Sequence, residues 1–188
     1  MPVVEPKLRY DHLRQLPEDG RRYELAEGVL WASSPPRERH QRVVARLVAW
    51  LDGLGRAGLG RVYPAPFDVV LSEETVFQPD VLFVREEHRG VVTEENVQGP
   101  PDLVVEVLSE ATRECDLGLK LRLYAHYGVP ETWIVDPDGR SVRIFRRGPE
   151  GRYVEETTVR PGQALTSPLL GDARFPVEEL FDGGAGLA

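Results

Sequence analysis

The segment PDLVVEVLSEATRECDLGLK, residues Pro101–Lys120, decides how the rest of the chain is expected to fold. Its first part, Leu103–Leu108, is a short apolar run preceded by prolines, which is typical of a buried strand. Glu106 interrupts this run, and because strand side chains alternate between faces, it must point to one side of the sheet. A buried carboxylate needs a cationic partner, a retained proton or a metal ion. The segment therefore predicts a polar site against a buried sheet.

A second acidic residue, Asp80, lies in the similar segment QPDVLFV, residues Gln78–Val84. Two such strands can converge on one divalent cation, and Mg²⁺ is typically held by one or two carboxylates, with waters and substrate phosphates completing its shell. Taken separately, Asp80 and Asp102 also fit ordinary turn residues after proline, and Glu106 also fits an ion pair with an arginine. Both interpretations stay open at this point.

Several motifs together resemble a known family. They are YELAEGVL (Tyr23–Leu30), Pro35-Pro36, His40, QPDVLFV, PDLVVEVLS (Pro101–Ser109), Lys120, Tyr124, Gly128-Val129 and WIVDP (Trp133–Pro137). From about Tyr23 to about Phe145 the chain is similar to the Uma family of bacterial putative restriction endonucleases, within the P-D…(D/E)-X-K nuclease superfamily. The resemblance implies an α/β (α+β) fold, with a restriction-endonuclease-like core of mixed β-sheet flanked by helices.

The resemblance also implies a Mg²⁺-dependent endonuclease that hydrolyses phosphodiester bonds of DNA, with Mn²⁺ able to substitute. Asp80 and Glu106 would hold the metal together with the carbonyl of Val107. The superfamily motif places a lysine two residues after the glutamate, where this chain has Leu108. Lys120 would replace that lysine, so the implied catalytic residues are Asp80, Glu106 and Lys120.

The segment Asp116–Tyr127 is predicted to be a helix that ends at Gly128, a common C-terminal cap. Asp116, Lys120 and Tyr124 follow each other at four-residue spacing, so they form one polar stripe. Because this helix directly follows the glutamate strand, the stripe can fold back over Glu106. Tyr124 would then orient a phosphate or water, although a plain salt bridge between Asp116 and Lys120 fits the spacing too.

Two further residues have open interpretations. Tyr23–Ala32 alternates around Glu27-Gly28, which predicts an N-terminal β-hairpin with Glu24 in its first strand. Glu24 fits either a solvated strand position or a supporting place near the active site that the resemblance implies. His40 likewise fits a polar capping residue or a supporting site residue, since it falls on the family's histidine.

The segment Arg37–Leu54 is predicted to be a helix with an apolar face toward the core. Its opposite stripe contains Arg39, Arg42 and Arg46. These arginines are candidate substrate-binding residues that would contact phosphates, but a charged stripe on a helix is also typical of a solvated face.

The length of the chain and the positions of its loop-forming residues predict three parts. They are a lead-in segment over residues 1–20, one nuclease-like domain over 21–182 and a disordered tail over 183–188. The lead-in contains a short predicted helix, and the connection 86–99 reads as polar and mobile. Further strands are expected at Arg61–Tyr63, Phe67–Leu71, Thr132–Asp136, Ser141–Arg146 and Tyr153–Val159.

Composition narrows the function classes. A net charge of −8 argues against a protein that coats nucleic acid non-specifically, because such binding depends on Lys and Arg. The single cysteine, Cys115, excludes an internal disulfide, and the absence of long apolar runs predicts a cytoplasmic protein without membrane contact. Cutting both strands of duplex DNA would call for a homodimer. A catalytically inactive module with a nuclease fold is the alternative, and a hydrolase of small phosphoesters is a third hypothesis.

Overall fold

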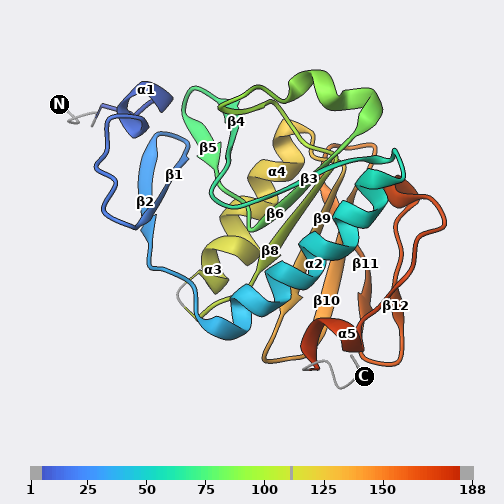
Figure 1. Cartoon of the computed structure of the whole chain (residues 1–188). Helices are drawn as coiled ribbons and strands as arrows, with labels where there is room; N and C mark the ends of the chain where they lie inside the picture. Colours follow the sequence, from blue (N-terminus) through green and yellow to red (C-terminus); the bar gives the residue numbers. More distant parts are fainter. Residues whose placement is uncertain (1–5, 111, 183–188) are drawn as a thin grey trace.

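The computed structural model describes residues 6–110 and 112–182, and it is built around one large mixed sheet (Figure 1). Strands β8 and β9 are parallel, whereas the other neighbours are antiparallel. In spatial order the strands are β11 (Tyr153–Val159), β10 (Ser141–Arg147), β9 (Glu131–Asp136), β8 (Leu103–Val107), β6 (Val81–Arg85) and β3 (Gly60–Pro64). The predicted mixed sheet with flanking helices is confirmed.

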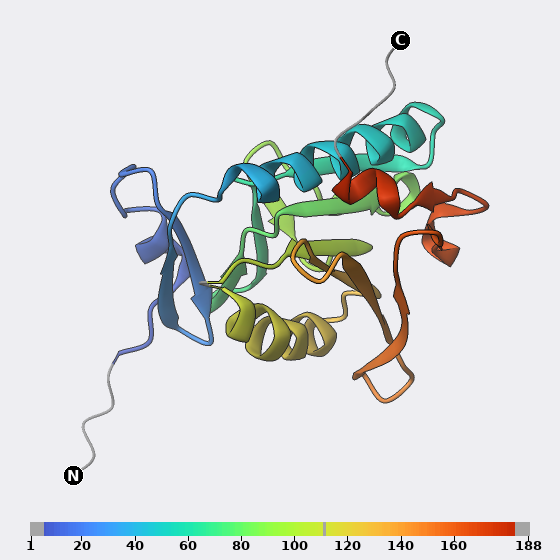
Figure 2. The ribbon, with the colours of Figure 1, turned by 90° about the horizontal axis from the view of Figure 1, so that it is seen from below.

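Helices α2 (Glu38–Arg56) and α4 (Leu121–Tyr127) lie on opposite faces of this sheet (Figure 2). The alternation along β8 explains the two layers, since its odd-numbered residues belong to the α2 side and its even-numbered residues to the α4 side. Leu103, Val105 and Val107 pack in one apolar cluster with residues of α2, and Val104 packs with Tyr124 in another. The predicted strand at Glu106 is therefore buried from both sides.

A smaller sheet stands beside the large one (Figure 1). Its strands, in spatial order, are β2 (Val29–Ser33), β1 (Arg22–Ala26), β5 (Thr75–Phe77), β4 (Asp68–Ser72) and β7 (Asn96–Gln98). The predicted hairpin is confirmed as β1 and β2, whose turn residues Glu27 and Gly28 both have positive φ, at 53° and 85°. Such a turn matches the twist of a two-residue hairpin and favours glycine at its second position.

The lead-in is attached to this small sheet. Its predicted short helix is α1 (Tyr10–Leu13). Leu13 is buried against Leu25 and Val76, and the Tyr10 hydroxyl donates to an oxygen of Asp68 at 2.9 Å. The lead-in therefore covers the face of β1 that turns away from the large sheet. Residues 1–5 lie outside the described part, as does the tail 183–188.

The helical segment after β8 differs from the predicted single helix. It begins with α3 (Arg113–Cys115), continues as a π-helical turn, η2 (Asp116–Lys120), and ends as α4, with Gly128 in the left-handed conformation at φ 97°. Thr112 is the N-cap residue of α3, and its amide donates to the Ser109 hydroxyl at 3.2 Å. π-Helical turns are uncommon and often occur at functional sites.

The connection predicted to be mobile is structured. It contains the 3₁₀ helix η1 (Glu86–Val91) and strand β7, and His88 lies 2.7 Å from the buried carboxylate of Asp102. After β11 the chain forms β12 (Ala164–Leu165), η3 (Pro168–Leu170), β13 (Phe175–Pro176) and α5 (Glu178–Phe181). This last part covers the α2 side of the sheet through Phe175, Val177 and Leu180. Within the described residues, no helix has the length and apolar character needed to cross a membrane.

Candidate active site

Asp80 immediately precedes β6 and lies beside Glu106 of β8. Val81 of β6 pairs with Val105 of β8 in antiparallel register, and the amide of Val107, the residue after Glu106, donates to Oδ2 of Asp80 at 2.8 Å. Directly opposite residues of an antiparallel pair point to the same face. The two carboxylates are 4% and 2% exposed, and both line one pocket, whose wall includes residues from the start of α2 and from η2.

Asp80 is held by three hydrogen-bond donors. Arg22 donates to Oδ1 at 2.8 Å, the amide of Val107 donates to Oδ2 at 2.8 Å, and Nε2 of His40 lies 3.0 Å from the same oxygen. Burial opposes ionisation of this carboxyl, but His40 and Arg22 outweigh burial and lower the pKa of Asp80 to about 2. Asp80 is therefore an ionised, fixed acceptor.

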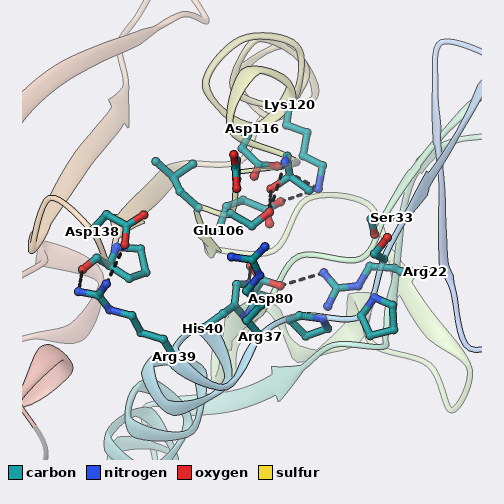
Figure 3. Close-up of a pocket in the computed structure, with 18 of the residues that line it drawn as sticks. Arg22, Ser33, Arg37, Arg39, His40, Asp80, Glu106, Asp116, Lys120 and Asp138 are labelled. Carbon is teal, nitrogen blue, oxygen red and sulfur yellow. Dashed lines mark hydrogen bonds and ion pairs between the residues drawn. The ribbon is translucent and has the colours of Figure 1, made fainter.

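Lys120 reaches into the same site from η2. Its Nζ lies 3.0 Å from Oε1 of Glu24, 3.2 Å from Oε1 of Glu106 and 3.4 Å from Oδ1 of Asp116 (Figure 3). Burial favours the neutral amine, yet the three surrounding carboxylates raise the pKa of Lys120 well above its usual value. Lys120 is thus a buried ammonium ion. The salt bridge to Asp116 and the contact with Glu106 are both present.

Glu106 differs electrostatically from Asp80. Tyr124 donates its hydroxyl to Oε1 of Glu106 at 2.7 Å, and Lys120 shares that oxygen. Burial is the largest cause that raises the pKa of Glu106 to about 8, and the nearby Asp116 and Asp80 carboxylates act in the same direction, against Lys120. Glu106 is therefore much easier to protonate than Asp80.

The buried acids outnumber their permanent cations. Glu24, Asp80, Glu106 and Asp116 would carry four negative charges against the two positive charges of Lys120 and Arg22. Oδ1 of Asp116 is buried without a hydrogen-bond partner among the described residues. This excess of buried carboxylate oxygens is what a divalent cation would neutralise.

The donor set fits a hard cation that takes oxygen ligands. No three His, Cys, Asp or Glu side chains in the described ranges group as a ready-made metal cage. Mg²⁺ does not require one, because it is usually bound through one or two carboxylates and completes its shell with water and phosphate oxygens. Asp80 and Glu106 meet this pattern, and a carboxylate oxygen that accepts one hydrogen bond keeps a further lone pair.

The pocket has a volume of about 560 Å³. Figure 3 shows Arg22 and Ser33 on one side of it and Arg39 and Asp138 on the other. The lining residues that bear on its chemistry are Arg22, Glu24, Ser33, Ser34, Arg37, Arg39, His40, Asp80, Glu106, Leu108, Asp116 and Lys120. Every predicted catalytic side chain thus lies in one pocket, together with the supporting residues Glu24 and His40. Tyr124 lies beneath it, in contact with Glu106.

The three predicted phosphate-binding arginines are not equivalent. Arg39 lines the pocket and donates to Asp138 at 2.7 Å and to the carbonyl of Pro137. Arg42 pairs with Glu38 on the outer surface of α2, and neither Arg42 nor Arg46 lines the pocket. The structure therefore brings only one member of the stripe to the site.

Sequence reasoning missed Arg22, the direct partner of Asp80. The sequence feature that could have identified Arg22 is its position two residues before Glu24 on the same strand. This spacing puts both side chains on one face. Leu108, the residue that follows β8, occupies the position of the motif lysine. It lines the pocket and packs with Ile134 and Phe145, so no cation projects from that position.

Fold and site together define a restriction-endonuclease-like protein with a pocket of buried acids and a lysine. The sequence profile described as Uma2, putative restriction endonuclease, matches residues 10–178, so the chain belongs to this family. The fold is similar to that of a putative nuclease of DUF820 from Anabaena variabilis, with a TM-score of 0.76, 16% sequence identity and coverage of 93% of this chain and 97% of that chain. No curated protein sequence matches this chain significantly. The resemblance seen in the motifs is thereby confirmed.

Proposed function

We propose that this chain is a Mg²⁺-dependent endonuclease that hydrolyses phosphodiester bonds of DNA, with Asp80, Glu106 and Lys120 as its catalytic residues. Family membership supports nuclease function. The single observation that supports the finer proposal is that one pocket contains two buried carboxylates, those of Asp80 and Glu106, with a buried ammonium ion 3.2 Å from Glu106.

Each residue has a defined part in the proposal. Asp80 and Glu106, with the carbonyl of Val107, would hold Mg²⁺, which would supply charge neutralisation at the phosphate. Arg22 and His40 fix Asp80, and Tyr124 orients Glu106. Lys120 stays protonated, so it acts as a donor toward a water or a phosphate oxygen rather than as a base.

The direct test is cleavage of supercoiled plasmid DNA in Mg²⁺, with single-strand and duplex oligonucleotides assayed beside it. The wild-type protein should cut, and Asp80→Asn and Glu106→Gln should each lower the rate by at least about a hundredfold. The control variant is Arg42→Ala, whose substituted residue lies outside the pocket, and it should cut at the wild-type rate. Equal rates in all four proteins would mean that a contaminant or another site performs the cleavage. Cutting of both duplex strands would call for a two-fold dimer, which sedimentation measures.

One observation favours a second function, an inactive nuclease-fold module that binds rather than cuts. The motif lysine is absent, and Lys120 already contacts three carboxylates. Calorimetric titration with Mg²⁺ separates the two functions. An enzyme should bind the ion in the wild type and lose binding in Asp80→Asn, whereas an inactive module has no requirement for a competent metal site.

A further inference from the structure

The strand β2 carries an unusual concentration of exposed apolar side chains. Among the described residues, the large apolar side chains with strong exposure are Val29, Leu30, Trp31 and Val154. Three of these are consecutive on β2, and Trp31 is 44% exposed. Single exposed apolar residues are ordinary on protein surfaces, but neighbouring ones commonly mark a binding surface. Because strand side chains alternate, Val29 and Trp31 are such neighbours on one face of β2, and Leu30 lies on the other face.

The hairpin register shows which way Trp31 faces. Trp31 pairs with Glu24, and Ser33 pairs with Arg22. Because paired residues share a face, Trp31 and Ser33 lie on the face of the hairpin that sends Glu24 to Lys120 and Arg22 to Asp80. Ser33 lines the pocket, and Trp31 is two residues, about 7 Å of extended strand, further along. The exposed indole therefore borders the candidate active site.

The surroundings supply the other groups that a nucleotide needs. Ser33 and Ser34 line the pocket with hydroxyl groups, and Arg37 lines it with a guanidinium. Arg37 is exposed and forms no salt bridge with any residue in the described ranges. The segment 31–37 thus offers an aromatic surface, two hydroxyls and an unpaired cation in sequence along one rim of the pocket. Aromatic rings that bind bases and cations that follow the backbone are the usual elements of single-strand recognition.

We propose that Trp31 stacks on an unpaired nucleobase next to the phosphate that occupies the pocket. The preferred substrate is then single-stranded or locally opened nucleic acid, since the faces of paired bases are covered by their neighbours in a duplex. This inference rests on the proposed nuclease function and adds the substrate class. The competing occupant is a second copy of the chain, which would pair with the free edge of β2. Such pairing uses backbone groups, whereas the facing of Trp31 toward the site favours a ligand that also enters the pocket.

The test measures binding of a 5′-fluorescein-labelled oligothymidine single strand and of a labelled duplex, with Ca²⁺ in place of Mg²⁺ to prevent cleavage. The variant Trp31→Ala should weaken binding of the single strand by about fivefold to a hundredfold. Trp31→Tyr should keep most of the affinity, because tyrosine also stacks. Duplex binding should change by less than about twofold. Val154→Ala, which removes an exposed apolar side chain on β11, should behave as the wild type.

Three outcomes overturn the inference, and each has a separate meaning. Unchanged single-strand affinity in Trp31→Ala, with binding intact in the wild type, rejects the stacking role and leaves the proposed nuclease function standing. A second outcome is a wild-type dimer that becomes a monomer in Trp31→Ala, measured by sedimentation, with oligonucleotide affinity unaltered. That result assigns β2 to a contact with a second copy. A wild-type protein that neither binds nor cuts any oligonucleotide removes the proposed function and the inference together. Melting temperatures of the variants confirm that each one is folded.

Discussion

The two faces of β8 are buried to the same extent but have opposite character. On the α2 side, Leu103, Val105 and Val107 are at most 1% exposed and belong to the apolar cluster between α2 and the sheet. On the α4 side, Glu106 is 2% exposed and depends on Lys120 and Tyr124. The first face stabilises the fold, whereas the second contains charges whose burial costs free energy. The difference shows that one strand can present an apolar face to the core and a charged side chain to a pocket, separated only by the alternation of its side chains.

The largest expected effect is on the charged face. Lys120→Arg keeps the positive charge but replaces a compact ammonium ion by a planar guanidinium, which cannot adopt the same contacts with three carboxylates. We expect Mg²⁺-dependent cleavage to fall by about 10²–10⁴-fold, measured on folded protein as judged by circular dichroism. The matched control is Lys7→Arg, which changes the chain's other lysine at an exposed position. Activity within tenfold of the wild type in Lys120→Arg would remove Lys120 from the chemistry.

The apolar face should respond in stability instead of activity. Leu47 is fully buried in the cluster between α2 and the sheet. Leu47→Ala should lower the free energy of unfolding by about 2–5 kcal/mol in denaturant titrations, because it removes apolar contacts and leaves a cavity. Gln41→Ala, on the exposed side of the same helix, should change it by less than about 0.5 kcal/mol. Cleavage per folded molecule should stay at the wild-type level; a specific loss of activity in Leu47→Ala would contradict the division between the faces.

The next effect links the charged face to pH. Without metal, folded Glu106 keeps its proton up to a pKa of about 8, whereas in the unfolded chain the pKa of a glutamate is about 4.3. Its contribution to stability is therefore fully present below about pH 4.3 and is lost as the pH rises toward 8. A bound cation would reverse this loss, since it requires the ionised carboxylate. The rise in melting temperature caused by Mg²⁺ should consequently be larger at pH 8.5 than at pH 6.5, by scanning fluorimetry.

Asp80→Asn is the control for that measurement. It removes one of the two proposed ligands, so Mg²⁺ should shift its melting temperature little at either pH. A shift in the wild type that is equal at both pH values would mean that the ion binds away from Glu106.

The smallest expected effect concerns the arginines of α2. Arg39 lines the pocket and Arg42 does not, although they are three residues apart on one helix. Arg39→Ala should weaken DNA binding and lower the dependence of log K on log salt by about one unit, while Arg42→Ala should leave that slope unchanged. Fluorescence anisotropy over a range of NaCl concentrations measures both. If log K depends equally on log salt in the two variants, Arg39 does not contact DNA phosphates and acts only as a structural partner of Asp138.

The sequence predicted the parts of the site that depend on local periodicity. The two-residue period of strands placed Glu106 on a buried face, and the four-residue spacing of Asp116, Lys120 and Tyr124 placed their stripe over it. Arg22 was missed because its partner, Asp80, is set by how the small sheet docks beside the large one, which no local pattern encodes. Strands β5 and β7 were missed for a different reason, since each has three residues and cannot display a period. The π-helical turn at Asp116–Lys120 likewise depends on tertiary contacts of its buried side chains.

The most direct measurement is a crystal structure of the protein with Mn²⁺, read by the anomalous scattering of the metal. The proposed nuclease site predicts one ion between the carboxylates of Asp80 and Glu106, with the carbonyl of Val107 as a further ligand and water or phosphate oxygens completing the shell. The same crystals of Asp80→Asn should lack that ion. A well-ordered site with no metal between the two carboxylates, at a Mn²⁺ concentration that supports cleavage, would contradict the proposed function.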